Sequence, residues 1–67
     1  MTIYHGYNEE GGKWRIVATI EHEESRLFPC WWLESPGFRH LSAHTTLNAA
    51  KAAWRRLDGE GTRWKAR

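Results

Sequence analysis

The strongest constraint on this chain is that 67 residues must form a core with five tryptophans and one cysteine. A single cysteine closes no internal disulfide, so a disulfide scaffold is excluded and a reducing, cytoplasmic setting is expected. A domain this short buries only about 60% of the surface that its unfolded chain exposes. Large aromatic side chains must therefore supply much of the core of a single domain.

Several functional classes are disfavoured by the same arithmetic. A core this small leaves little room for a deep catalytic pocket, and the sequence has no phosphate-binding loop, paired-carboxylate spacing or serine nucleophile elbow. His40 and His44 lie four residues apart, but no Cys-x-x-Cys or His-Glu-x-x-His spacing accompanies them. We expect a binding domain rather than an enzyme, with no metal, no cofactor, no signal segment and no membrane span.

Two segments near the amino end have the pattern of strands. Residues 2–7 are rich in β-branched and aromatic side chains, and residues 13–22 alternate between apolar and polar positions. A turn over residues 8–12 separates them. The alternation predicts one face that is buried, formed by Trp14, Ile16, Ala18 and Ile20, and one that faces away, formed by Lys13, Arg15, Val17, Thr19 and Glu21.

The next segment carries a tryptophan pair. Residues 26–34 predict a third strand that is broken, bulged or at a sheet edge, because Pro29 cannot donate to a ladder. Neighbouring strand residues point to opposite faces, so one of Trp31 and Trp32 must face away from the core. We expect Trp32 to face outward and, with Phe28, to form a partner-binding patch.

A helix is predicted in the carboxyl-terminal third. Thr45 or Thr46 can cap its start, and Gly59 can end it. Apolar residues recur at spacings of three and four, which puts them on one side of a helix that packs on the sheet. These residues are Leu47, Ala50, Trp54 and Leu57.

The predicted architecture is of the α+β class. A three- to four-stranded antiparallel sheet packs on one carboxyl-terminal helix in the order β-β-β-α, with residues 38–42 as a fourth short strand or irregular chain. Residues 1–58 form the domain, and residues 59–67 form a short basic tail.

Charge is distributed unevenly along the chain. Residues 1–50 carry four basic and six acidic residues, whereas residues 51–67 carry six basic and two acidic residues. Basic residues interleaved with an aromatic can neutralise phosphates and stack on bases, although a solvated helix face would have the same composition. The candidate nucleic-acid-binding residues are Lys13, Arg15, Lys51, Arg55, Arg56, Arg63, Trp64 and Lys65.

Two motifs resemble those of a known family. The first comprises Tyr4-His5-Gly6 and Gly12-Lys13-Trp14-Arg15-Ile16, and the second comprises Thr46, Ala49-Ala50 and Ala53-Trp54 in the helix. Over residues 4–57 the chain resembles the APETALA/ethylene-response type DNA-binding domain and the arm-binding domains of phage and transposon integrases. The resemblance implies a three-stranded sheet on one helix, with the sheet laid in the major groove of DNA.

The leading expectation is a small cytoplasmic domain that binds nucleic acid, with DNA as the first choice, through the basic helix and tail and the sheet face. The alternative is a protein-interaction module of phage or mobile-element type that acts on a host protein through the tryptophan patch. A homodimer formed through the exposed sheet face is a variant of that alternative.

Overall fold

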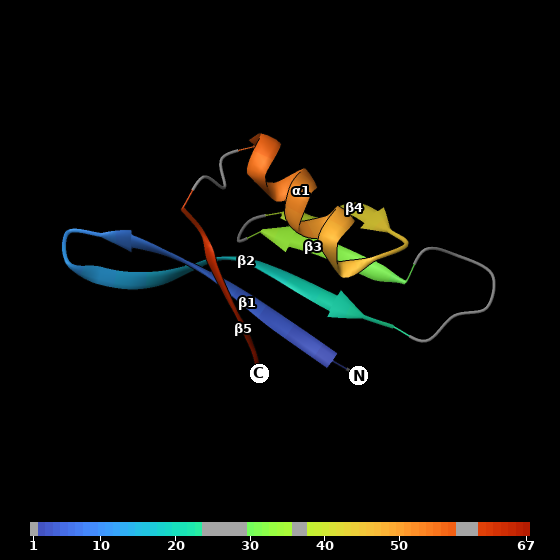
Figure 1. The fold of residues 1–67 in the computed structure, drawn as a ribbon, viewed down its shortest axis with the longest axis horizontal. Helices are drawn as coiled ribbons and strands as arrows, with labels where there is room; N and C mark the ends of the chain where they lie inside the picture. The colour runs from blue at the N-terminus through green and yellow to red at the C-terminus, as the bar shows by residue number, and fades with distance from the viewer. Residues whose placement is uncertain (1, 24–29, 36–37, 58–60) are drawn as a thin grey trace.

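The computed structural model describes residues 2–23, 30–35, 38–57 and 61–67. These ranges contain five strands and one helix in the order β1 (Thr2–Glu10), β2 (Lys13–His22), β3 (Trp31–Ser35), β4 (Phe38–His44), α1 (Leu47–Leu57) and β5 (Arg63–Ala66) (Figure 1). All strand pairs are antiparallel, and the sheet order is β4-β3-β2-β1-β5. The predicted α+β class is therefore confirmed.

The order of elements differs from the predicted β-β-β-α at the carboxyl end. Residues 63–66, expected in a basic tail, form the edge strand β5, which pairs with β1. The segment alternates Arg63, Trp64 and Lys65, and this period-two pattern lets one face pack on β1 while the other stays in water. The charge of the segment does not prevent it from joining the sheet.

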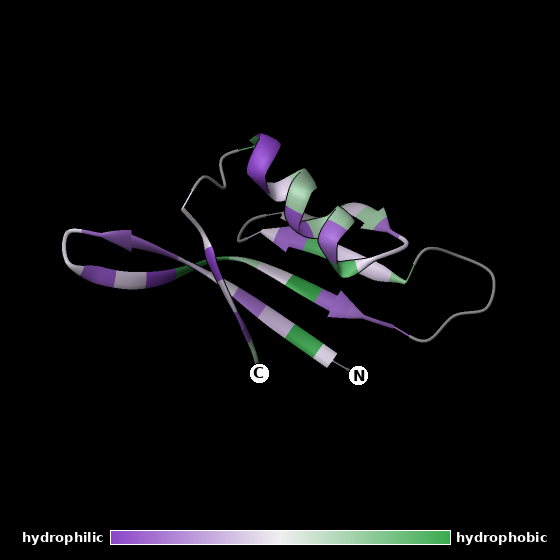
Figure 2. Ribbon diagram, in the orientation of Figure 1, coloured by the Kyte–Doolittle hydropathy of each residue, from purple (hydrophilic) through white to green (hydrophobic). Residues whose placement is uncertain are grey.

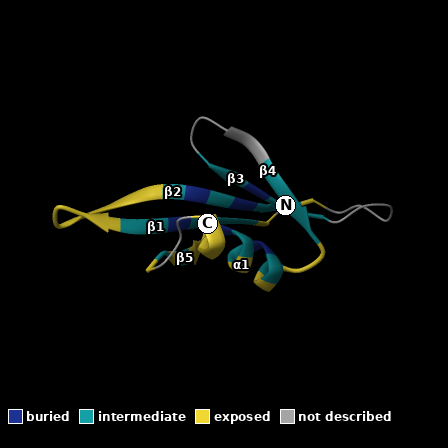
Figure 3. Ribbon diagram, turned by 90° about the horizontal axis from the view of Figure 1, so that it is seen from above, coloured by how far each residue is buried: buried dark blue, intermediate teal, exposed yellow. Residues whose placement is uncertain are grey.

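The β1–β2 hairpin forms an arm that extends beyond the helix. Gly11 and Gly12 at its tip have φ values of 58° and 80°. Two successive residues with positive φ are what a two-residue turn of the primed type requires, so the glycine pair suits the turn. The arm gives the molecule its length, with extents of 42 × 23 × 21 Å. Figure 3 shows the exposed tip, and Figure 2 shows that the arm is largely hydrophilic.

A register shift in this hairpin reverses the faces of β2. Gly6 lies opposite Ala18, but the next residue, Tyr7, lies opposite Ile16, which leaves Val17 as an extra residue in β2. An extra residue moves every side chain beyond it to the other face. The prediction that Trp14 and Ile16 share the buried face of Ala18 and Ile20 is therefore wrong. Trp14 is 47% exposed and Ile16 is 45% exposed.

The core lies between α1 and the strands β2, β3 and β4. Trp54, 6% exposed, and Ala50 pack from the helix against Ala18, Ile20 and Leu33 of the sheet. Thr46 caps the helix as predicted, because its Oγ1 accepts a hydrogen bond from the Ala49 amide at 3.1 Å. The expected inward position of Leu57 is wrong, since that side chain is 62% exposed at the end of the helix. Gly59, the predicted end of the helix, lies outside the described residues.

The edge strand β5 is held by one contact of a tryptophan ring with a glycine and by two hydrogen bonds between side chains. The Trp64 ring lies directly over Gly6, where a Cβ atom would come within 2.8 Å of ring atom Cζ3. The Trp54 indole N–H donates to Thr62 Oγ1 at 2.9 Å, and the Thr62 hydroxyl donates to the side-chain oxygen of Asn8. The helix, the start of β5 and β1 are therefore tied together by one chain of contacts.

We expect Gly6→Ala to destabilise the protein by about 1–3 kcal/mol, because the added methyl group overpacks the space under the Trp64 ring. Urea unfolding of Gly6→Ala, Trp64→Ala and the double variant measures this as a cycle. In the Trp64→Ala background, the cost of Gly6→Ala should fall substantially. An equal cost in both backgrounds would contradict the contact between Gly6 and Trp64.

Candidate functional site

The face of the sheet opposite α1 is the open face. The strand register determines which residues lie on this face. Across β2, β1 and β5, the neighbours are Ile16, Tyr7 and Arg63 in one row and Thr19, His5 and Lys65 in the next. Across the described residues, α1 packs on the other face. The open face consists of Ile3, His5, Tyr7, Glu9, Trp14, Ile16, Thr19, Glu21, Trp32, Glu34, Ala43, Arg63, Lys65 and Arg67.

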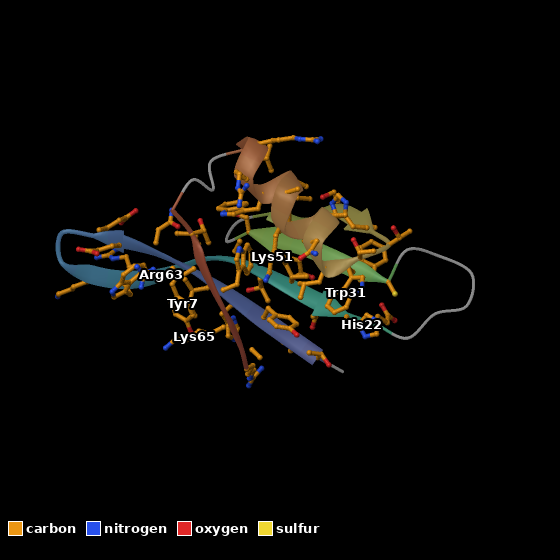
Figure 4. All side chains as sticks on the ribbon, viewed as in Figure 1. Tyr7, His22, Trp31, Lys51, Arg63 and Lys65 are labelled. Atoms are coloured by element: carbon orange, nitrogen blue, oxygen red, sulfur yellow. The ribbon has the colours of Figure 1, made fainter. Side chains whose placement is uncertain are left out.

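A hollow on the open face brings two aromatic and two basic side chains together. It has a volume of about 360 Å³ and is lined by Tyr7, Trp14, Arg63 and Lys65. The Arg63 guanidinium lies over the Trp14 ring, 5.2 Å from its centroid. This cation–π contact places a positive charge beside the aromatic surface of Trp14. Figure 4 shows Tyr7, Arg63 and Lys65 together where β5 crosses β1.

Three cations follow one another along the edge of the open face. The Arg67 amide donates to the Ile3 carbonyl at 2.7 Å, which extends the β1–β5 ladder by one residue. Arg63, Lys65 and Arg67 therefore occupy alternate positions with the same orientation, about 7 Å apart. We call these three residues the basic row. All three are exposed.

Acidic residues bound the same face on its other side. Glu21 of β2 lies two strands away from Arg67, with Ile3 between them, and Glu34 of β3 lies beyond Thr19. The open face thus carries the basic row on β5 and aromatic and apolar residues on β1 and the first half of β2. It carries carboxylates at the far end of β2 and on β3. Glu9, opposite Trp14, adds a carboxylate near the tip of the arm.

His5 lies next to Tyr7 on the open face of β1 and opposite Thr19 of β2. Its ring meets the Tyr7 ring edge-on at a centroid distance of 6.3 Å. Its Nδ1 is buried and has no hydrogen-bond partner within the described part of the chain. The aromatic character of β1 on this face therefore continues from Tyr7 to His5.

The structure separates the predicted nucleic-acid-binding residues. Arg63 and Lys65 lie on the open face, but Trp64 points to the helix side and packs on Gly6. Lys13 and Arg15 also fall on the helix side of the arm, because of the extra residue in β2. Arg15 comes within 4.0 Å of Glu10, and both side chains are mostly exposed, so this ion pair contributes little to stability.

The helix cations form a separate group. Lys51 lies 5.9 Å from the centroid of the Tyr4 ring, which in turn contacts Trp31. The His22 ring lies 4.3 Å from the Trp31 ring, tilted by 38°, so a run of aromatic rings lines the helix side of the sheet (Figure 4). Arg55 and Arg56 are exposed on α1. The helix cations therefore do not share the open face with Arg63 and Lys65.

The tryptophan pair has the predicted orientation. Trp31 packs against the core, whereas Trp32 pairs with Glu21 and lies on the open face. Trp32 is only partly exposed, and among the aromatic side chains that the structure describes Trp14 is the most exposed. Phe28, its expected neighbour, lies outside the described residues. A partner-binding role for Trp32 stays a prediction.

Neither a metal site nor a membrane span is found among the described residues. No cluster of three or more His, Cys, Asp or Glu side chains suited to a metal occurs within those ranges, where Cys30 is a partly buried free thiol. The helix found there is not long and apolar enough to cross a bilayer. His44 Nε2 instead lies 2.6 Å from the Ser42 hydroxyl.

Comparison with known proteins does not identify this chain. No family model, no curated protein and no solved structure matches it. The resemblance to the APETALA and integrase arm-binding domains is therefore left untested, and functional inference must come from the geometry of the open face.

We expect Trp14→Ala to change the free energy of unfolding by less than about 1 kcal/mol, because the ring is half exposed and loses mainly its contact with Arg63. Trp54→Ala should cost about 3–5 kcal/mol, since it empties the core. Urea unfolding of both variants measures the difference. Similar losses for the two would place Trp14 in the core and contradict the reversed register.

Proposed function

We propose that this protein is a nucleic-acid-binding domain, with DNA as the first candidate, and that the open face of the sheet is its binding surface. The observation that carries the proposal is the hollow in which Tyr7 and Trp14 lie beside Arg63 and Lys65. Nucleic acid offers flat bases and anionic phosphates side by side, and this surface offers a partner for each.

The charge pattern supports the location. The basic row lies directly beside the aromatic residues of β1, so one ligand can contact both. Phosphate contacts of this kind supply most of the affinity of non-specific binding and release counterions, which makes the affinity depend on salt. Exposed Trp14 and Ile16 supply apolar surface that a chain with so small a core would otherwise bury.

The test compares two pairs of cations. Arg63→Gln/Lys65→Gln removes two charges from the open face, and Arg55→Gln/Arg56→Gln removes two from the exposed helix surface. Binding to a short fluorescein-labelled oligonucleotide, in single-stranded and duplex form, is followed by anisotropy between about 50 and about 200 mM salt. Circular dichroism establishes that both variants are folded.

For single strands, three phosphate contacts predict a slope of about −2 for log K against log salt, falling to about −0.7 when two cations are lost. The helix pair should leave both the affinity and the slope close to wild type. No binding of either nucleic-acid form at about 50 mM salt would overturn the proposal. A loss of affinity in Arg55→Gln/Arg56→Gln alone would place the interface on α1 and contradict its assignment to the open face.

A further inference from the structure

We propose that the open face binds a single unpaired strand, with its phosphates along the basic row and its bases on the aromatic hollow, and that it rejects duplexes. This inference rests on the proposed function and names the form of nucleic acid that the surface accepts.

The aromatic rings of the hollow favour an unpaired strand. The exposed ring of Trp14 and the ring of Tyr7 can stack only on a base whose face is free. In a duplex both faces of each internal base are covered by its neighbours, whereas an unpaired strand can splay its bases onto a protein surface. The hollow is therefore useful to a single strand and of little use to a duplex.

The arrangement of the cations beside the aromatic residues also suits a single strand. A single strand has its phosphates on one side and its bases on the other, which matches the basic row on β5 beside the aromatic residues of β1. Successive cations about 7 Å apart give the backbone a linear path along one edge. Lys65 lies on that path and also lines the hollow, so the two parts of the site meet there.

A carboxylate lies beyond the aromatic residues, on the side away from the basic row. Glu21 is two strand spacings from the basic row, or about 10 Å. The two backbones that border a groove of a duplex are about 6 or 12 Å apart, so the second backbone would come near Glu21. The phosphates of that second backbone and the Glu21 carboxylate would repel each other, whereas a single strand on the basic row does not reach Glu21. The acidic border thus acts against duplexes.

The two cations of the β1–β2 hairpin, which could contact base edges in a duplex, lie on the other side of the sheet. Lys13 and Arg15, the cations of the central hairpin, face the helix side of the arm. The positions of β1 and β2 that do lie on the open face include Tyr7, Trp14 and Ile16. These side chains offer stacking and apolar contact rather than the multiple hydrogen bonds that base edges in a groove require.

The first experiment measures anisotropy with one labelled oligonucleotide, alone and annealed to its complement. The single strand should bind at least about tenfold more tightly than the duplex, the ratio expected if one good stacking contact is lost. Trp14→Ala should weaken single-strand binding about 5- to 150-fold, and Trp14→Phe should restore much of it. Urea unfolding establishes that these variants keep their stability.

The second experiment removes the acidic border. Glu21→Gln should raise the affinity for the duplex and so lower the ratio of single-strand to duplex affinity. Glu10→Gln is the matched control, since it removes one carboxylate from the helix side of the arm. Equal gains from the two substitutions would contradict the role assigned to Glu21.

The outcomes separate this inference from the proposed function. Equal binding of both forms, or single-strand binding that is unaffected by Trp14→Ala, would overturn the inference while leaving nucleic-acid binding intact. Failure of both forms to bind the wild-type protein would overturn the proposed function itself. Preference for the single strand together with loss in Trp14→Ala supports both.

Discussion

The extra residue Val17 in β2 determines what the open face can do. Without it, Trp14 and Ile16 would share the face of Ala18 and Ile20, and the arm would present Lys13 and Arg15 on the open side. With it, the aromatic side chain comes to the side where Arg63 and Lys65 lie. One inserted residue thus changes a conventional basic strand surface into an aromatic hollow bordered by cations.

The position of β5 is the second condition for this surface. Its basic side chains reach the open face only because Trp64 turns the other way and lies over Gly6. Thr62 then links the strand to Trp54 in the helix and to Asn8 in β1. The core and the proposed binding surface therefore share a strand, in which Trp64 packs on Gly6 and its neighbours Arg63 and Lys65 lie on the open face.

The sequence predicts the elements of this fold better than the faces of its sheet. The alternation of residues 13–22 and the threonine cap of the helix identify β2 and the start of α1 correctly. The bulge escapes this reasoning because Ile16 and Val17 are both apolar, and either can occupy a buried position without breaking the pattern. The adjacent apolar pair, with Gly6 near by in the partner strand, is the signal that could have indicated it.

The sequence pattern does not predict the edge strand β5, for a different reason. Arg63, Trp64 and Lys65 alternate as a strand should, but their charge favours the interpretation of a solvated tail. A strand of four residues gains its stability from pairing and from Trp64, which are long-range contacts that no local pattern reports. The composition of the segment therefore indicates Arg63 and Lys65 as candidates, while their joint position with Tyr7 and Trp14 depends on β5 itself.

The proposed binding surface depends on the position of Trp14, which lies on the open face beside Tyr7 and Arg63. Nuclear Overhauser contacts from the Trp14 indole protons test it most directly, in uniformly labelled protein. We expect contacts to the side chains of Tyr7 and Arg63, together with a backbone register that pairs Tyr7 with Ile16. Contacts from Trp14 to Trp54, with Val17 directly opposite Tyr7, would contradict it.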